Sequence, residues 1–227
     1  AGKGIKKLQS AGIMVKAGVL EQECRETNKF FLKHVKTGLP YITIKTAQTI
    51  DGKIANNKYE SKWISSLESR KLVHKMRAVY DAVLIGKNTV KYDNPELTVR
   101  LAKGRNPVRI VIDPLLKTDI KSKIYNANAA DTIVVTSNSA SKTLRQKFEK
   151  QGIIVLSVKS KNGIIDIKEA LIKLGILGLN SIIVEGGSFT YSHLIKNNLV
   201  DEYIIFVAPK IMGNGISSFT EKFAPAK

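Results

Sequence analysis

The sequence predicts an α/β fold in which helices cover a mostly parallel β-sheet. Short apolar runs rich in β-branched residues recur along the chain, and several are almost continuously apolar, as strands buried on both faces are. Segments with helix-capping signals lie between some of these runs. The 227 residues, of which 43% are hydrophobic, are enough to bury a core. Strands that alternate with helices are typical of parallel sheets.

Residues 1–38 are predicted to form a small piece that precedes the sheet. The pattern indicates a short basic helix over 2–11, a strand over 12–19 and a charged amphipathic helix over 20–36. The Gly38-Leu39-Pro40 sequence then breaks the chain. This piece is short for a domain of its own.

Seven apolar runs are predicted to be the strands of the sheet, and four helices are expected among them. The strands cover residues 41–47, 82–86, 108–112, 132–136, 153–156, 181–184 and 203–208. Ser65 and Glu68 have the spacing of a capping box, which opens a helix with Leu72, Met76 and Val79 on one face. The other helices cover 141–151, ending at Gly152, 166–174, ending at Gly175, and 188–198, which follows a Gly-Gly turn.

The net charge of +18 is spread along the chain rather than gathered in one block. Thirty lysines and seven arginines supply the positive charge. A basic chain suggests a nucleic-acid or membrane-surface partner, but this even distribution favours a general compositional bias. No apolar run reaches the roughly 18 residues of a membrane span, and no signal-peptide core is present. With Cys24 as the single cysteine, the sequence predicts a cytoplasmic protein without an internal disulfide.

The sequence Glu185-Gly186-Gly187-Ser188 is the first candidate for chemistry. It follows a predicted buried strand and opens a helix, so free backbone N–H groups lie at the carboxyl end of the strand. Open α/β sheets bind phosphorylated ligands at this position, and glycine lets a phosphate approach the backbone closely. The alternative is a plain turn in which Glu185 caps the helix or forms a salt bridge.

Four other residues have both a functional and a structural interpretation. Lys45 on the first strand is a functional cation or a surface residue, and the pattern alone favours the surface residue. Trp63, in a polar loop, stacks on a planar ligand or fills the core, and the core is favoured. Arg77 and Arg100 stand out in a lysine-rich chain because arginine suits bidentate binding of phosphate or carboxylate; the alternative is two structural ion pairs. The three histidines lack metal-ligand spacing, so no metal site is predicted.

Several short motifs, taken together, resemble the reductase half of the bifunctional riboflavin-biosynthesis deaminase/reductase family. In order over residues 39–215 they are Leu39-Pro40-Tyr41, Asp51-Gly52-Lys53, Ser61-Lys62-Trp63-Ile64, Asp93-Asn94-Pro95, Leu97-Thr98-Val99-Arg100, Arg109-Ile110-Val111-Ile112-Asp113, Val184-Glu185-Gly186-Gly187 and Ala208-Pro209-Lys210. Each motif is weak alone, whereas the ordered set is specific. The resemblance implies a dihydrofolate-reductase-like three-layer fold with a mostly parallel central sheet flanked by helices.

The resemblance also implies NADPH-dependent reduction of 5-amino-6-(5-phosphoribosylamino)uracil. A hydride goes to C1′ of the ribosyl group in its open imine form and gives the ribitylamino product. The positions that match cofactor contacts are Ala47, Trp63, Thr89, Asp93, Gly187, Ser188, Phe189, Thr190, Tyr191, Ser192 and His193. The positions that match contacts to the phosphorylated ribosylaminopyrimidine substrate are Ser61, Arg77, Leu97, Arg100 and Glu185. Lys45 and Glu185 are expected to be the catalytic polar groups near the reacting ribose.

By the same resemblance, residues 39–227 form the reductase domain, and residues 1–38 are a remnant of the C-terminal part of the deaminase domain. Family members continue through further strands beyond the position of Lys227. The expected partners are a second copy of the chain and a separate deaminase protein, with no nucleic acid and no membrane. Two alternatives stay open. One is a related reductase of another pteridine or pyrimidine, against which Ser61, Arg77 and Arg100 argue, and the other is a basic nucleic-acid-binding protein.

Overall fold

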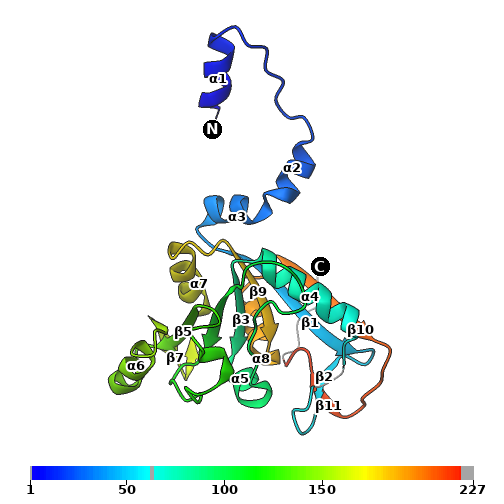
Figure 1. The fold of residues 1–227 in the computed structure, drawn as a ribbon, viewed down its shortest axis with the longest axis vertical. Coiled ribbons are helices and arrows are strands. Elements are labelled where there is room, and N and C mark those ends of the chain that lie inside the picture. The colour runs from blue at the N-terminus through cyan, green and yellow to red at the C-terminus, as the bar shows by residue number, and fades with distance from the viewer. Residues whose placement is uncertain (1, 62–63, 221–227) are drawn as a thin grey trace.

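The computed structural model describes residues 2–61 and 64–220 and has the predicted α/β architecture (Figure 1). Within these residues, seven parallel strands form the main sheet in the order β10-β1-β9-β3-β4-β5-β6. The strands are β1 (Tyr41–Thr49), β3 (Ala82–Gly86), β4 (Val108–Ile112), β5 (Thr132–Ser137), β6 (Ile154–Val158), β9 (Ser181–Gly186) and β10 (Glu202–Ala208). Each of the seven predicted runs forms one of these strands, so the fold class is confirmed.

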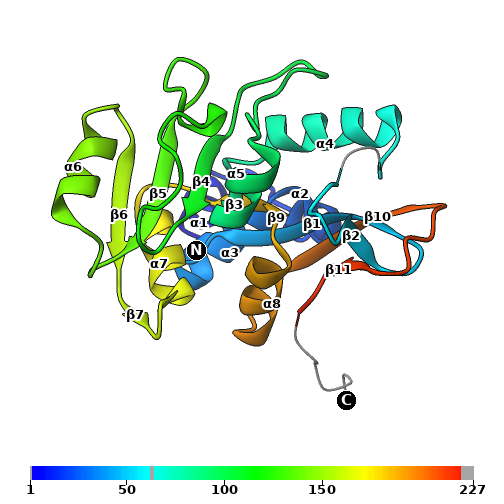
Figure 2. The same ribbon diagram turned by 90° about the horizontal axis from the view of Figure 1, so that it is seen from below.

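Helices cover both faces of the sheet and make three layers (Figure 2). One face carries α4 (Leu67–Val79), α5 (Lys87–Asp93) and α6 (Lys142–Glu149), and the other carries α7 (Ile167–Ile176) and α8 (Ser188–Lys196). The smaller elements are the 3-10 helix η1 (Lys123–Tyr125) and two antiparallel ribbons, β2 (Lys53–Asn56) with β11 (Gly215–Ser217) and β7 (Ser160–Lys161) with β8 (Ile164–Ile165). No helix in the described part of the chain is long and apolar enough to cross a membrane.

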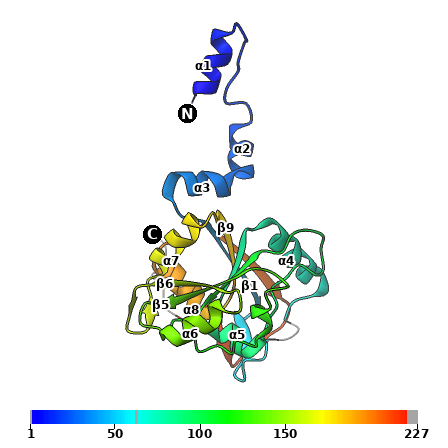
Figure 3. The same ribbon diagram turned by 60° about the vertical axis from the view of Figure 1, so that its left-hand side comes forward.

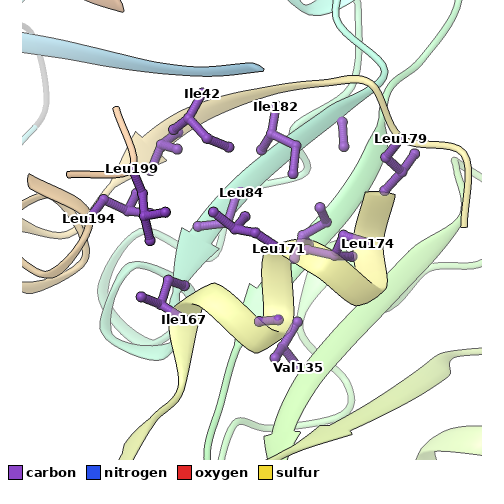
Figure 4. Close-up of a cluster of buried hydrophobic side chains, with 14 of the residues drawn as sticks. Ile42, Leu84, Val135, Ile167, Leu171, Leu174, Leu179, Ile182, Leu194 and Leu199 are labelled. Atoms are coloured by element: carbon purple, nitrogen blue, oxygen red, sulfur yellow. The ribbon is translucent and has the colours of Figure 1, made fainter. Parts of the chain in front are cut away.

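The core consists of two apolar clusters, one on each face of the sheet. Leu84 of β3 packs in the cluster that contains Leu171 of α7 and Leu194 of α8 (Figure 4). Its neighbour Ile85 points to the opposite face and belongs to the cluster that contains Phe148 of α6. Because both faces of the sheet are covered, its central strands have no solvent-facing side. This double burial explains why they are almost continuously apolar in the sequence.

The predicted strand over residues 12–19 is absent from the structure. α1 (Lys3–Ser10) forms as predicted, but the segment after it has no strand beside it to complete a hydrogen-bond ladder. Met14 in this segment is 96% exposed. Figures 1 and 3 show α1 and this connecting segment standing away from the sheet. The apolar residues of 12–19 therefore do not make a strand on their own.

The single helix predicted over residues 20–36 is also wrong, because it is divided into two. α2 (Glu21–Thr27) and α3 (Lys29–Thr37) meet at Asn28. The Asn28 side-chain amide donates to the carbonyl of Cys24, which also accepts the Asn28 backbone N–H. Asparagine at this position ends the first helix and opens the next.

Two predicted helix ends lie elsewhere in the structure. α4 is capped by Ser66 rather than Ser65, and the Ser66 hydroxyl accepts the backbone N–H of Ser69. Either serine could cap this helix by residue type, and the spacing to Glu68 pointed to the wrong one. α7 continues through Gly175 and ends before Gly178, which has φ +86° and serves as the C-terminal stop.

The face of α4 that carries Leu72 and Val79 is not the face that the helix buries. Leu72 and Val79 are 49% and 63% exposed, whereas His74 and Arg77 are buried. The helix turns this polar pair inward because Arg77 binds the carboxylate of Glu185 on the sheet. The ion pair shares this buried face with Val73, which is 6% exposed, and with Met76, which packs against the core.

Gly175 is required by a close approach between α7 and the end of α3. A β-carbon at this position would lie 2.6 Å from the carbonyl oxygen of Gly38. We expect Gly175→Ala to lower the free energy of unfolding by about 1–3 kcal/mol, since the added methyl group overpacks a fixed backbone contact. Denaturant unfolding measures this change. The matched control is Gly4→Ala, because a β-carbon there meets nothing within 4 Å; equal stabilities of the two variants would contradict the packing argument.

Candidate active site

A cavity of about 540 Å³ opens at the carboxyl edge of the parallel sheet, where ligands bind in open α/β folds. Residues of β1, β3, β4 and β9 line it together with the first turns of α5 and α8 and residues of the β2–β11 ribbon. The lining residues are Lys45, Thr46, Ala47, Ile54, Ala55, Tyr59, Ser61, Ile64, Ser65, Gly86, Lys87, Asn88, Thr89, Tyr92, Asp93, Ile112, Pro114, Gly163, Glu185, Gly186, Gly187, Ser188, Phe189, Thr190, Tyr191 and Ile216.

Three glycines bring bare backbone to the surface of this cavity. A β-carbon at Gly86 would lie 2.8 Å from Oγ1 of Thr190, and one at Gly186 would lie 2.6 Å from Oγ1 of Thr89. Gly187 has φ +90° and precedes α8, whose N-terminus carries no side-chain cap among the described residues. The β9–α8 junction thus offers backbone N–H groups and the positive end of a helix dipole to an anionic ligand.

Glu185 is a buried carboxylate held between two cations. The Arg77 guanidinium binds it through two hydrogen bonds, Nε to Oε1 at 2.6 Å and Nη2 to Oε2 at 2.8 Å. Nζ of Lys45 lies 3.6 Å from Oε2, and the Glu185 side chain is only 4% exposed. Burial alone would raise the pKa of Glu185, but the attraction of Arg77 and Lys45 outweighs it and lowers that pKa to about 2. Glu185 is therefore ionised at neutral pH.

Lys45 is held so that its ammonium group stays at the cavity wall. The buried Tyr191 hydroxyl donates to the backbone carbonyl of Lys45 at 2.9 Å, and burial raises the pKa of Tyr191. Nζ also lies 5.9 Å from the centroid of the Phe206 ring. With a side-chain exposure of 14%, Lys45 is neither a freely solvated surface residue nor sealed in the core. Its ammonium group is thus available to a ligand in the cavity.

Contacts between residues 59–61 and helix α5 form another part of the lining. The Ser61 hydroxyl donates to Oδ1 of Asp93 at 3.1 Å, and burial raises the pKa of Asp93 although Ser61 partly offsets it. The Tyr59 and Tyr92 rings stack with centroids 4.0 Å apart. Sequence reasoning missed both tyrosines. In the sequence, the one sign of them is that aromatic residues stand in polar segments. The left-handed backbone of Tyr59, with φ +64°, is seen only in the structure.

The structure brings together eleven of the predicted site residues around the cavity: Lys45, Ala47, Ser61, Thr89, Asp93, Glu185, Gly187, Ser188, Phe189, Thr190 and Tyr191. Trp63 lies outside the described residues. Arg77, Leu97, Arg100, Ser192 and His193 do not line the cavity. His193 stacks on Phe189 with ring centroids 5.9 Å apart, and Ser192 accepts the backbone N–H of Thr220.

Arg77 and Arg100 both form ion pairs with glutamates of the chain, as the alternative to ligand binding predicts. Arg77 lies behind Glu185, away from the cavity lining, and its guanidinium is committed to that carboxylate. Arg100 pairs with Glu96 at 2.6 Å, with side chains 51% and 42% exposed, and also donates to Oγ1 of Thr98. The exposed pair of Arg100 is weak, so another anion can replace Glu96 in it, whereas the buried pair of Arg77 is costly to break. Their roles in substrate binding remain predictions.

His74 lies beside this network and is expected to make stability depend on pH. Its side chain is buried, and Nδ1 accepts the N–H of Arg100. Burial, assisted by Arg77 and Arg100, lowers its pKa from 6.5 to about 4. Between these values the unfolded chain binds a proton that the folded chain does not, so the free energy of unfolding should fall as the pH is lowered from 6.5 to 4. Denaturant unfolding across this range tests it: His74→Asn should have a shallower slope, and an unchanged slope would contradict the assignment.

Comparison with known proteins places this chain in a family. Residues 40–224 match the family model described as the RibD C-terminal domain. The chain belongs to the RibD C-terminal domain family. Among curated members, the riboflavin biosynthesis protein RibD of Aquifex aeolicus is 44% identical over 218 residues, which are 96% of this chain and 60% of that protein. The chain thus spans about 60% of the length of the RibD protein that it matches.

Solved structures of RibD proteins share the fold. The Thermotoga maritima protein, described as a diaminohydroxyphosphoribosylaminopyrimidine deaminase/5-amino-6-(5-phosphoribosylamino)uracil reductase, superposes with a TM-score of 0.83 and 34% identity over 100% of this chain and 62% of its own. Acinetobacter baumannii RibD superposes with a TM-score of 0.85 and 29% identity over 99% of this chain and 62% of its own. The predicted dihydrofolate-reductase-like, three-layer fold is confirmed.

Proposed function

We propose that the chain catalyses the NADPH-dependent reduction of 5-amino-6-(5-phosphoribosylamino)uracil to its ribitylamino product. The observation that carries the proposal is the ionised Glu185, held by Arg77 and Lys45 at the wall of the cavity, next to a glycine-lined helix N-terminus. Membership of the RibD C-terminal domain family and the description of the Thermotoga maritima relative support it. Polar groups and an anion site around one cavity suit a phosphorylated sugar substrate with a dinucleotide cofactor.

The residues around the β9–α8 junction suit NADPH as the cofactor. Gly86 and Gly186 let β3 and β9 pack closely against Thr190 and Thr89 at the cavity wall, and the N-terminus of α8 is suited to a pyrophosphate. We assign the holding of NADPH to Ala47, Trp63, Thr89, Asp93 and the residues from Gly187 to His193. When bound, NADPH supplies the hydride.

Lys45 and Glu185 have different roles at the reacting ribose. Because the pKa of Glu185 is about 2, its carboxylate cannot donate a proton at neutral pH. We therefore assign to Glu185 the acceptance of a substrate hydrogen bond and the stabilisation of positive charge as the sugar opens to its imine. The ammonium of Lys45, which shares that carboxylate, donates the hydrogen bond or proton to the ring oxygen.

The substrate phosphate is assigned to Arg100. A phosphate competes readily with Glu96 for this guanidinium, because that ion pair is half exposed. Arg77 then acts through Glu185 rather than on the phosphate, since its buried bidentate pair is costly to break. Ser61 and Leu97 complete the proposed substrate contacts.

The organisation of the chain is proposed along the same lines. The family match begins at residue 40, which supports residues 39–227 as the reductase domain and residues 1–38 as a segment related to the deaminase half. We also propose a homodimer and a separate deaminase protein as partners. Size measurement in solution and co-purification with a RibD-type deaminase test these two assignments.

The experiment that tests the activity follows the near-ultraviolet absorption of NADPH as it is oxidised. The substrate arm uses the deaminated aminouracil ribosyl phosphate, and the control arm uses the non-deaminated pyrimidine. We expect oxidation with the former only. If NADPH is oxidised with other pteridines and ribose 5-phosphate does not inhibit that reaction, the related-reductase alternative is favoured. Steeply salt-dependent nucleic-acid binding without any NADPH oxidation would favour the nucleic-acid alternative and overturn the proposal.

A further inference from the structure

The loop of residues 97–101 is fastened to the buried face of α4 by two side chains. Nδ1 of His74 accepts the backbone N–H of Arg100 at 2.9 Å. One turn further along the helix, Nη1 of Arg77 donates to the carbonyl of Thr98 at 3.2 Å. His74 is 6% exposed, so its hydrogen bond to the loop is shielded from water.

This loop has a backbone conformation that needs such support. Leu97 has φ +55°, a left-handed value that a branched side chain rarely adopts, and its side chain is buried in the core. The backbone N–H of Val99 is tied to Oδ1 of Asn106 at 2.7 Å. The loop is therefore held at Leu97, Thr98 and Val99, and His74 supplies the next contact along the chain, at Arg100 itself.

The loop carries Arg100 as a preformed cation. The Arg100 guanidinium donates to Glu96 at 2.6 Å and to Oγ1 of Thr98 at 2.9 Å, so its own loop orients it while about half of its side chain stays in solvent. Arg77 links the loop to the cavity, because the same guanidinium that holds Thr98 also holds Glu185. The position of Arg100 relative to the cavity thus depends on contacts that α4 makes.

We propose that His74 is a positioning residue that fixes Arg100 for the phosphate of the ribosyl substrate. This inference rests on the proposed function, which gives the phosphate to Arg100. His74 acts through the backbone of Arg100 and touches neither the substrate nor the cofactor. Its Nδ1 must be an acceptor, so the neutral ring carries its proton on Nε2. Burial and the neighbouring Arg77 and Arg100 keep the ring neutral, as its lowered pKa indicates.

Two polar, uncharged variants separate positioning from a general loss of structure. Asparagine places its amide oxygen near the position of Nδ1, whereas glutamine carries its amide further out, near the position of Nε2. We expect His74→Gln to raise KM for the ribosyl phosphate about tenfold, the effect of one lost shielded hydrogen bond, with kcat and the KM for NADPH within about threefold of wild type. His74→Asn should restore the KM for the ribosyl phosphate to within about threefold of wild type.

Hydrogen exchange of the Arg100 and Leu101 amides gives a readout that needs no catalysis. Both amides donate to Nδ1 of His74, at 2.9 and 3.4 Å. They should exchange faster in His74→Gln than in wild type and at nearly the wild-type rate in His74→Asn. The proposal is overturned if exchange accelerates in His74→Gln while KM for the ribosyl phosphate is unchanged. It is also overturned if both variants behave alike or if the KM for NADPH rises instead.

Calorimetric titration with ribose 5-phosphate distinguishes failure of this inference from failure of the proposed function. If the wild-type chain reduces no substrate but binds ribose 5-phosphate, and His74→Gln binds it about tenfold more weakly, the positioning role stands and the proposed activity fails. If the wild-type chain does not bind ribose 5-phosphate, or both variants bind it as well as wild type does, the positioning role is overturned.

Discussion

Replacement of Arg77 by methionine is expected to destabilise the fold by about 3–5 kcal/mol. The variant leaves the Glu185 carboxylate, 4% exposed, with Lys45 at 3.6 Å as its remaining cation among the described residues. Removal of one partner from a buried pair leaves an uncompensated buried charge. The free-energy cost of that charge is much larger than the net stabilisation that the intact pair provides. The same loss should raise the pKa of Glu185, since the attraction of Arg77 is the largest influence that lowers it.

Denaturant unfolding at neutral pH measures the effect, with Arg25→Met as the matched control. Arg25 also donates two hydrogen bonds to a glutamate, both to Oε1 of Glu21, but both side chains are more than half exposed. Such a surface pair contributes about 0.5 kcal/mol or less, so the control should be nearly as stable as wild type. A loss of stability in Arg77→Met no larger than that of Arg25→Met would show that the buried pair does not hold α4 against the sheet.

Replacement of Lys45 by methionine is expected to lower kcat/KM by about a hundredfold or more, because the variant removes the proposed donor to the ring oxygen. Methionine keeps most of the packing of the aliphatic stem beside Phe206. The free energy of unfolding should change little, since Arg77 still holds Glu185. Initial rates of NADPH oxidation with the aminouracil ribosyl phosphate measure the loss.

Lys147→Met is the control for the change in net charge, since Lys147 is exposed on α6 and does not line the cavity. Its kcat/KM should match that of wild type. If Lys45→Met retained kcat/KM within a few-fold of wild type, Lys45 would have no part in the reaction and the proton would have to come from another group.

Much of the fold was predictable because its strands are buried on both faces. Runs such as 82–86 and 108–112 are apolar at nearly every position, so their strand bounds follow from composition alone, and β3 and β4 have the predicted ends. Where packing depends on distant partners, prediction failed. The burial of Arg77 on α4 depends on Glu185, 108 residues away in the sequence, and no local pattern encodes that contact.

The site was predictable in part for a related reason. Glu185 and its glycines stand out because they follow a buried strand, and the parallel topology brings Lys45 to the same edge. Residue type alone could not tell that Arg77 lies behind Glu185, or that Tyr59 stacks on Tyr92 of α5, 33 residues further along the chain. His74 was considered only for metal spacing, and its actual contact, a backbone N–H of Arg100, leaves no trace in the sequence.

The most direct test of the central claim is the fate of hydride in the product. NADPH labelled with deuterium at the hydride-donating carbon is incubated with the chain and the aminouracil ribosyl phosphate, and the product is analysed by mass spectrometry and NMR. We predict one deuterium on C1′ of a ribitylamino product, and loss of this product in Lys45→Met. Deuterium on the pyrimidine ring, or an unlabelled product, would contradict the assignment of this cavity to reduction of the ribosyl group.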